Sequence, residues 1–304
     1  MLGSATTTIR AHYRGRFASL PTGNLHFGSL FTAVASYADA RAHGGLWLLR
    51  IEDLDRTRAV PGAAAHLIHT LQAFGFIWDE PIIFQRDRTV VYQSALAQLT
   101  AQGLTYPCSC SRSNIAQQAQ FGIDGAIYPG ICRHGFRAGA QPRTIRLRTT
   151  APAVRFIDRI QGQRTQHIEK EVGDFVLRRA DGIHAYQLAV VVDDAAQGIT
   201  HIVRGADLLI STPRQLLLQQ FLGLAQPNYA HLPLIVDADG RKLSKSLTAA
   251  PVDPAYPLPI LHHIWQLLNQ EPLPITTSVT AFWQQAIRHW QCARISPYST
   301  LHID

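Results

Sequence analysis

Apolar and polar positions along the first third of the chain follow two periods in turn, one typical of strands and one typical of helices. The apolar runs are short and are followed by longer stretches in which apolar residues recur every three to four positions. The pattern predicts strands at 9–18, 46–51 and 82–85 and helices at 24–43, 61–74 and 89–102. Such alternation predicts an α/β fold built on a Rossmann-like, doubly wound parallel sheet.

The periodicity is lost after Tyr106 and returns near residue 184. The segment between is rich in glycine, proline and cysteine, which predicts a small insert that splits the sheet. Strands are predicted at 144–149, 154–160, 174–179, 184–192, 200–203 and 232–236, and helices at 212–222, 260–269 and 280–292. We therefore expect a first catalytic half (1–107), an insert (108–183), a second catalytic half (184–236) and a polar loop with a small helical C-terminal region (237–304).

Composition and charge narrow the class of protein. Hydrophobic residues make up 46% of the chain and charged residues 16%, as in a globular protein. The net charge of +7 favours a polyanionic partner such as a nucleic acid. The residues Met1 to Thr8 lack a secretory pattern, and no apolar run approaches the length of a membrane span. A cytoplasmic location is therefore expected.

Two stretches far apart in the chain carry candidate phosphate chemistry. The first, residues 16–29, joins a strand to a helix through a turn with Pro21 and Gly23, and a helix N-terminus of this kind attracts anions. The second, residues 242–246, reads Lys-Leu-Ser-Lys-Ser and places two cations in a polar loop. Mobile lysines of this kind can stabilise charge on phosphate oxygens during phosphoryl or nucleotidyl transfer.

Together the two stretches resemble the HIGH and KMSKS motifs of the class I aminoacyl-tRNA synthetases. The resemblance implies an ATP site on a Rossmann-like sheet that an inserted domain divides. It implies that His26, with Ser29 beside it, contacts the ATP phosphates and that Gly28 leaves room for the adenosine. It also implies that Lys245, supported by Lys242, stabilises charge as the adenylate forms, with Mg²⁺ accompanying ATP.

Further segments resemble the glutamyl branch of that family. They are Arg16-Phe17-Ala18, Leu49-Arg50-Ile51-Glu52-Asp53, residues 186–194 and residues 202–207. The resemblance implies that Arg16 and Arg204 bind the carboxylates of glutamate, that Glu52 binds its ammonium group and that Tyr186 orients it. Arginine suits this task because its guanidinium can hold a carboxylate through two hydrogen bonds.

The short C-terminal region separates this chain from complete glutamyl-tRNA synthetases, which carry a helical anticodon-binding half there. Only residues 247–304 follow the lysine loop. The chain therefore resembles the truncated glutamyl paralogues, which transfer glutamate to the queuosine base of tRNA(Asp), and is expected to act as a monomer. Two alternatives stay open: a truncated enzyme that charges an ordinary tRNA 3′ end, and a non-catalytic tRNA-binding paralogue.

One position departs from the family pattern. The serine that is expected to touch the amino acid falls on Leu20, with Ser19 one position earlier. Either Ser19 substitutes through a shifted loop or one hydrogen bond is lost, at a cost of roughly 1.5–3 kcal/mol for a bond to a charged group. Glutamate binding could be weakened without loss of activity.

Three of the four cysteines lie within the insert, which favours a metal site over disulfides in a reducing compartment. The resemblance implies one structural zinc ion held by Cys108, Cys110, Tyr128 and Cys132. Three thiolates suit a closed tetrahedral site. Phenolate is an uncommon ligand, so His134 remains an alternative to Tyr128, and Cys292 is interpreted as an ordinary core residue.

Overall fold

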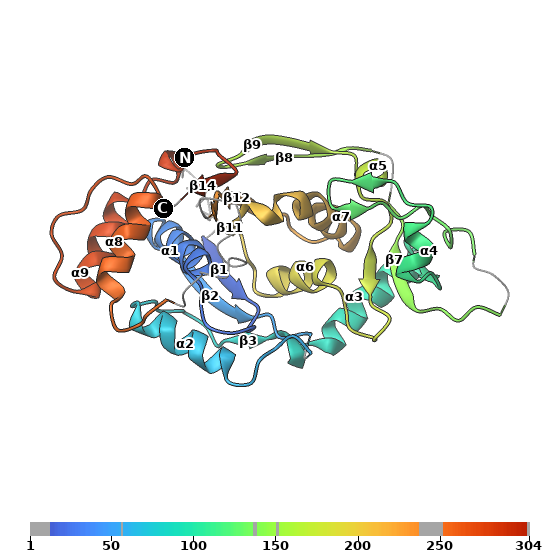
Figure 1. Cartoon of the computed structure of the whole chain (residues 1–304), viewed down its shortest axis with the longest axis horizontal. Coiled ribbons are helices and arrows are strands. Elements are labelled where there is room, and N and C mark those ends of the chain that lie inside the picture. Colours follow the sequence, from blue (N-terminus) through green and yellow to red (C-terminus); the bar gives the residue numbers. More distant parts are fainter. Residues whose placement is uncertain (1–12, 56, 136–138, 150–151, 237–251, 303–304) are drawn as a thin grey trace, which may run out of the picture.

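The computed structural model describes residues 13–55, 57–135, 139–149, 152–236 and 252–302. Two groups of strands abut at its centre, and an antiparallel insert lies at one end (Figure 1). The strands of both groups are parallel except β9, which is antiparallel to β8. The first group has the order β1-β2-β3, and the second has the order β11-β12-β8-β9. Their bounds are Arg14–Ser19 (β1), Leu46–Ile51 (β2), Ile83–Phe84 (β3), His201–Gly205 (β11), Asn228–Leu232 (β12), Val154–Asp158 (β8) and Gly162–Gln166 (β9).

The two groups meet along β1 and β11. The backbone N–H of Thr200 donates to the carbonyl of Arg14 (3.0 Å), and the N–H of Arg14 donates to Oγ1 of Thr200 (2.8 Å). The strand order reverses here, because β2 continues the sheet on one side of β1 and β12 continues it beyond β11. In open α/β sheets the crevice at such a switch point, outside the carboxyl ends of the strands, is where ligands bind.

Helices cover the sheet, and two large hydrophobic cores lie among the described residues, beside two smaller clusters. One core joins α1 to strands β1 and β2 and to the C-terminal helices α8 and α9, and the other joins α3, α6 and α7 to the insert. The helix bounds are Phe27–Ala42 (α1), Ala63–Ala73 (α2), Thr89–Ala101 (α3), Tyr186–Ala196 (α6), Thr212–Leu222 (α7), Pro257–Leu267 (α8) and Val279–His289 (α9).

The insert is built on three antiparallel strands in the order β10-β7-β4. The hairpin β8–β9, although it falls within 108–183, pairs with β12 of the central sheet through Asp158 and Tyr229. The C-terminal strand β14 pairs in parallel with β13. The remaining bounds are Thr105–Cys108 (β4), Arg112–Ala116 (α4), Phe121–Gly122 (β5), Gly125–Ala126 (β6), Thr144–Leu147 (β7), Ile168–Glu171 (α5), Val176–Arg178 (β10), Leu234–Val236 (β13) and Thr300–His302 (β14).

Most of the predicted elements are present, but the strand predicted at 184–192 is wrong. The structure has helix α6 there, from Tyr186 to Ala196. The run Leu188 to Val192 lies between α3, α7 and the insert, so every residue of it is buried. A helix that is buried on all sides loses the 3.6-residue period, and a short apolar run then cannot be distinguished from a strand.

The observed bounds of two other elements differ from the predicted ones. The helix predicted from Asn24 begins at Phe27, so His26 is its N-cap residue rather than part of its first turn. The single strand predicted at 232–236 is two strands, β12 and β13, interrupted at Pro233, which has no backbone N–H to donate to a ladder. Among the described helices, none is long and apolar enough to span a membrane.

Candidate active site at the ends of β1, β2 and β11

Helix α1 begins beside the carboxyl end of β1 and presents the first part of the candidate site. His26 caps this helix, and its Nδ1 is buried with no hydrogen-bond partner among the described residues. Gly28 lies in the first turn, where a Cβ would meet no atom of the described residues within 4 Å. Packing against the described residues therefore does not require glycine at 28, and they leave room beside it for a ligand. Ser29 is partly exposed in the same turn.

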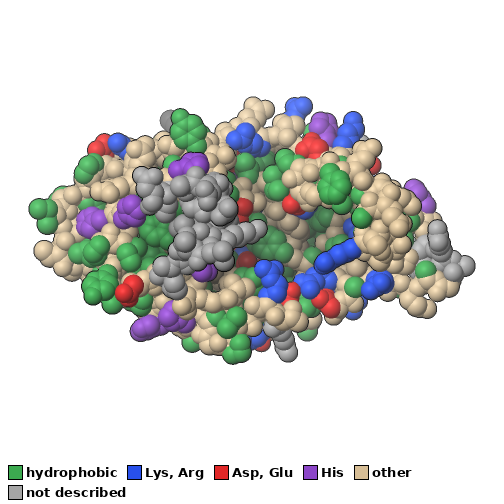
Figure 2. Space-filling view, viewed as in Figure 1, with side chains coloured by type: hydrophobic (Ala, Val, Ile, Leu, Met, Phe, Trp, Pro, Cys, Tyr) green, Lys and Arg blue, Asp and Glu red, His purple; other side chains and the backbone are tan. Residues whose placement is uncertain are grey.

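A small cavity opens where β1, β2 and β11 end, and we call it the β1–β11 cavity. Four of the residues predicted to bind glutamate lie on its wall, although they come from four separate elements. Arg16, Glu52 and Arg204 converge because parallel strands deliver their carboxyl ends to one edge of the sheet, and Tyr186 joins them from the first residue of α6. The lining residues are Arg16, Phe17, Ala18, Thr32, Glu52, Tyr186, Val203, Arg204 and Leu208. Figure 2 shows this face of the molecule hollowed near its middle, with charged side chains at the edge.

Arg16 is held on one side of the β1–β11 cavity by a buried carboxylate. Its Nε and Nη2 donate to the two oxygens of Asp194 (3.1 and 3.3 Å), and Arg50 also donates to Asp194 (2.8 Å). Arg50 is fully buried and makes a further bond to Gln197 (2.7 Å). The sequence motifs contain Arg50 and Asp194, but their spacing alone does not reveal that they brace Arg16.

Arg204 is braced differently, by neutral groups. Its Nε donates to Nε2 of His231 (3.0 Å), and its Nη2 donates to Oγ1 of Thr212 (2.9 Å). Its Nη1 is buried without a partner among the described residues. A buried guanidinium N–H without an acceptor is costly. The β1–β11 cavity beside Arg204 is thus suited to an anionic group that supplies the acceptor.

Two further groups in the cavity have shifted pKa values. Burial raises the pKa of Glu52, and the positive charges of Arg50 and Arg16 oppose this effect only in part. Burial also raises the pKa of Tyr186 to about 12. Tyr186 is therefore a neutral hydroxyl at physiological pH, able to donate or accept a hydrogen bond. A cationic group bound beside Glu52 would favour its ionised form.

Two further sequence predictions for this site concern Ser19 and the lysine loop. Ser19 and Leu20 do not line the β1–β11 cavity; the carbonyl of Ser19 accepts a hydrogen bond from the N–H of Glu52 (2.8 Å). The lysine loop with Lys242 and Lys245 lies outside the described residues. Thr32, which lines the cavity from α1, was not predicted, because a threonine inside an apolar helix carries no distinguishing signal.

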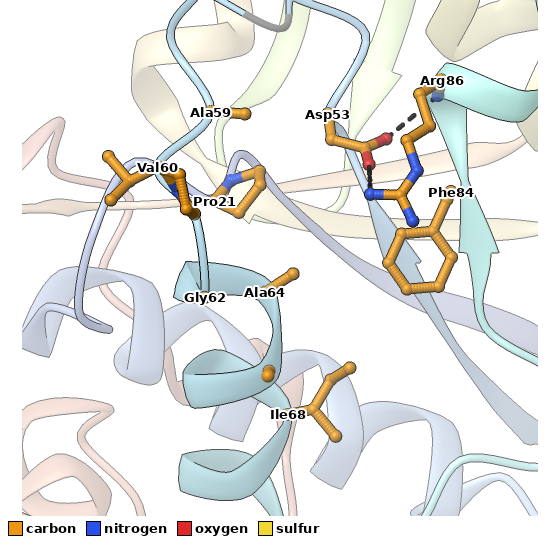
Figure 3. Close-up of a pocket in the computed structure, with 11 residues that line it drawn as sticks. Pro21, Asp53, Ala59, Val60, Gly62, Ala64, Ile68, Phe84 and Arg86 are labelled. Atoms are coloured by element: carbon orange, nitrogen blue, oxygen red, sulfur yellow. Dashed lines mark hydrogen bonds and ion pairs between the residues drawn. The ribbon is translucent and has the colours of Figure 1, made fainter.

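A larger hollow of about 430 Å³ lies on the other side of β2, between the loop at Pro21 and helix α2 (Figure 3). Asp53 lies on its wall and is paired with Arg86, whose Nη1 is 3.1 Å from Oδ2 and whose backbone N–H donates to Oδ1 (3.0 Å). Adjacent residues at a strand end point to opposite sides, so Glu52 faces the β1–β11 cavity and Asp53 the hollow. The hollow holds none of the predicted substrate ligands.

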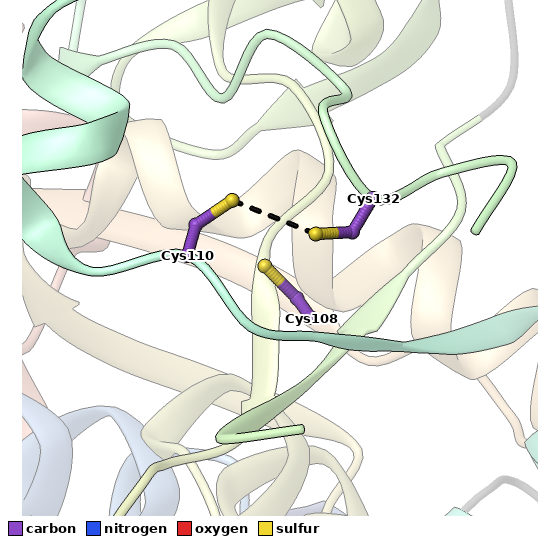
Figure 4. Close-up of side chains that lie close together, drawn as sticks. All are labelled: Cys108, Cys110 and Cys132. Atoms are coloured by element: carbon purple, nitrogen blue, oxygen red, sulfur yellow. Dashed lines mark hydrogen bonds between the residues drawn. The ribbon is translucent and has the colours of Figure 1, made fainter. Parts of the chain in front are cut away.

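The insert brings three cysteines together, and we call Cys108, Cys110 and Cys132 the three-cysteine cluster (Figure 4). Their sulfur atoms all lie within 4.8 Å of one another. The hydroxyl of Tyr128 lies 3.3 Å from the sulfur of Cys108 and 3.7 Å from that of Cys110. His134 is exposed and does not belong to the cluster. The arrangement could hold a tetrahedral metal ion, with Tyr128 nearest to the fourth position.

Local backbone geometry fixes the tyrosine against the cluster. Gly173 has φ of +73°, and a Cβ there would come within 3.0 Å of the backbone of Tyr128. The two residues form an isolated parallel bridge. The guanidinium carbon of Arg146 lies 3.8 Å from the ring centroid of Tyr128. A larger residue at 173 would push Tyr128 away from the sulfurs.

The fold and the candidate site agree with what is expected of a class I synthetase, and a comparison with known families shows the family. Residues 12–254 match the family described as tRNA synthetases class I (E and Q), catalytic domain. The chain therefore belongs to this family. A crystal structure of glutamate-tRNA synthetase from Elizabethkingia anophelis has the same fold, with a TM-score of 0.77 and 23% identity, over 96% of this chain and 68% of that one.

Curated relatives identify a narrower group within the family. A protein of Neisseria meningitidis serogroup B named glutamyl-Q tRNA(Asp) synthetase is 49% identical over 94% of this chain and 98% of its own length. Proteins of the same name from Burkholderia mallei and Dechloromonas aromatica are 52% and 57% identical. The match to the Burkholderia protein covers 94% of this chain and 98% of that protein. The match to the Dechloromonas protein covers 79% of this chain and 81% of that protein.

Proposed function

We propose that this chain activates glutamate with ATP and transfers it to the queuosine base of tRNA(Asp). The observation that carries the proposal is the convergence of Arg16, Glu52, Tyr186 and Arg204 on one cavity. Two cations, one carboxylate and one hydroxyl are the groups that a zwitterionic amino acid with an acidic side chain requires. The name glutamyl-Q tRNA(Asp) synthetase, shared by the curated relatives, supports the same substrate and acceptor.

In this account the first step is adenylate formation. The α-carboxylate of glutamate attacks the α-phosphate of ATP, a bond to that phosphorus forms, and pyrophosphate leaves. Arg16 and Arg204 hold the carboxylates, Glu52 accepts from the ammonium group and Tyr186 orients the substrate. His26, Gly28 and Ser29 form the ATP-binding turn, and Lys242 and Lys245 stabilise the charge on the phosphates. Positioning and charge stabilisation carry the step, with Mg²⁺ bound to ATP.

The second step transfers the glutamyl group to a hydroxyl of the cyclopentenediol ring of queuosine, and AMP leaves. The acceptor is part of a polyanion, and the net charge of +7 favours its association with the chain. We expect the KM for tRNA(Asp) to rise with salt, because phosphate contacts release counterions. The KM for ATP and glutamate in the first step should change much less.

Exchange of labelled pyrophosphate into ATP tests the first step. We expect exchange that depends on glutamate and Mg²⁺, at a rate well above that with glutamine, because Glu52 and the two arginines select a zwitterion with a second carboxylate. Absence of exchange at saturating glutamate would contradict the enzymatic proposal and favour a non-catalytic paralogue. Equal exchange with glutamine would contradict the assigned roles of the arginines.

We further propose that the three-cysteine cluster and Tyr128 hold one structural zinc ion. The donors fit, because the sulfurs lie close enough to share one ion and the phenol lies against two of them. The site would connect β4 to the loop before β7 and so fix the shape of the insert. Its four protein ligands would leave no open position for a reacting water.

Metal analysis tests this site. We expect one zinc per chain in the purified protein and a loss of most of it in Cys110→Ser, because a neutral hydroxyl is a poor zinc ligand. Cys292→Ser is the matched control, since Cys292 lies in the C-terminal region away from the insert and should leave the zinc content unchanged. Tyr128→Phe should weaken zinc retention and His134→Ala should not. Full zinc content in Cys110→Ser would exclude the site.

A further inference from the structure

His231 lies behind Arg204 and is fully buried in β12. Its Nδ1 is 2.6 Å from Oδ2 of Asp158, at the end of β8. A carboxylate can only accept, so Nδ1 carries the proton of the imidazole. The remaining nitrogen, Nε2, then has a free lone pair, and it faces a guanidinium that can only donate. The two neighbours therefore fix one tautomer of a neutral histidine.

Asp158 is itself held rigidly. Its Oδ1 accepts from the backbone N–H groups of Ile160 (3.0 Å), Gln161 (2.8 Å) and His231 (3.1 Å). Burial lowers the pKa of His231 to about 4, and the charge of Arg204 adds to this effect, although the bond to Asp158 opposes it. The histidine stays neutral at physiological pH, so Nε2 remains an acceptor.

The two arginines of the β1–β11 cavity differ in the charge of the groups that hold them. Arg16 is paired directly with the carboxylate of Asp194, which offsets its charge. Arg204 has no ion pair with a carboxylate among the described residues; its Nε and Nη2 contact the neutral side chains of His231 and Thr212. Its positive charge is thus left for a ligand, and its unpartnered Nη1 is buried at the wall of the β1–β11 cavity.

We infer that Asp158, His231 and Thr212 are positioning residues that orient the Arg204 guanidinium for a substrate carboxylate without neutralising it. The inference rests on the proposed glutamate site. An arginine side chain that is held in place before binding loses less conformational freedom when the substrate arrives. A carboxylate in place of His231 would hold Arg204 equally well but would compete with the substrate for its charge.

The sharpest variant is Thr212→Val, which keeps the shape of the side chain and removes the oxygen that Nη2 of Arg204 contacts. That oxygen also lies 3.1 Å from Nε2 of His231 and donates to the carbonyl of Leu208 (3.2 Å). We expect the KM for glutamate in pyrophosphate exchange to rise about tenfold, because a bond to a charged group is lost, with kcat and the KM for ATP within about twofold. Thr70→Val is the matched control. Thr70 is also fully buried and also bonds the carbonyl four residues earlier (2.9 Å), but from α2.

Two variants at His231 test whether a lost hydrogen-bond acceptor can be restored. His231→Leu fills the space without an acceptor, and we expect the KM for glutamate to rise tenfold or more. His231→Gln should recover most of this loss, because one amide can accept from Arg204 with its oxygen and donate to Asp158 with its nitrogen. A purely structural role would instead lower thermal stability in both variants and leave the KM unchanged.

The outcomes separate this inference from the function on which it rests. Normal exchange by the wild type, with an unchanged glutamate KM in Thr212→Val and in folded His231→Leu, would overturn the positioning role alone. Absence of exchange in the wild type would overturn the proposed function, and the inference with it. Where His231→Leu does not fold, Thr212→Val against Thr70→Val decides the question.

Discussion

Replacing Glu52 with glutamine is expected to raise the KM for glutamate by roughly 10- to 100-fold, since a hydrogen bond to a charged group contributes about 1.5–3 kcal/mol. Among the described residues that line the β1–β11 cavity, Glu52 is the one carboxylate, and it lies there with two arginines. An amide there keeps the volume but removes the charge that would attract the substrate ammonium. The KM for ATP should stay near the wild-type value.

The pH dependence of the KM for glutamate gives a second test of the role of Glu52. Only ionised Glu52 attracts an ammonium group, and burial raises the pKa of Glu52 above its ordinary value. As the pH falls through that raised pKa, Glu52 takes up a proton and the KM for glutamate should rise in the wild type. This acidic limb should be absent from Glu52→Gln, because an amide does not titrate in that range.

Asp53→Asn is the matched control for Glu52→Gln. The two residues are neighbours in the chain, but Asp53 faces the hollow beside α2 and is paired with Arg86. We expect its glutamate KM to stay within about twofold of the wild type. An unchanged KM in Glu52→Gln, or an acidic limb that survives the substitution, would remove Glu52 from the substrate site.

The largest expected effect on stability comes from Asp39, which is fully buried in α1. Its carboxylate accepts from Arg159 (2.5 and 3.0 Å), the hydroxyl of Tyr13 (2.5 Å) and Nε1 of Trp290 (2.9 Å). These bonds join α1 to the residue before β1, to the β8–β9 hairpin and to the C-terminal region. Asp39→Asn leaves Arg159 without its counter-ion, and we expect the free energy of unfolding at pH 7 to fall by about 3–5 kcal/mol.

The effect of Asp39 should depend on pH in a defined direction. Burial favours the neutral acid, but the bonds and charge of Arg159 outweigh it, and the folded pKa of Asp39 lies below the ordinary 3.8. Its stabilisation is therefore present above the unfolded pKa and is lost as the pH falls through the lower folded pKa. Urea unfolding should show the gap between wild type and variant narrow below about pH 4.

Asp87→Asn provides the comparison for Asp39→Asn. Asp87 is 69% exposed and its nearest cation, on Arg86, is 3.8 Å away. Exposed pairs contribute about 0–1 kcal/mol, so we expect little change. Equal losses in the two variants would mean that Asp39 acts through general charge rather than through its buried contacts.

Much of the fold was predictable because local patterns and tertiary burial agree. Helix α7 follows from Pro213 near its start, and Gly223 caps its end with φ of +67°. Helix α6 was not predictable from periodicity, because its apolar run is buried on every side. The strand predicted at 232–236 overlaps β12 only at Leu232, so the rest of β12 was missed. Its residues Tyr229 and His231 are buried for reasons of tertiary contact that no local pattern reveals.

The residues of the candidate site likewise include some that were predictable from the sequence and some that were not. Arg16, Glu52, Tyr186 and Arg204 were predicted through the resemblance, and they line one cavity in the structure. Asp158 and His231, which brace Arg204, come from a hairpin and a strand whose pairing depends on the whole sheet. Neither residue stands in a recognisable motif. Contacts between such distant segments become visible only once the fold is known.

The most direct test of the central claim is transfer of labelled glutamate to tRNA(Asp) with and without queuosine, followed by cleavage that separates the anticodon arm from the 3′ end. We expect label only with queuosine-containing tRNA and only in the anticodon fragment. Equal labelling of both tRNAs, or label at the 3′ end, would contradict the account.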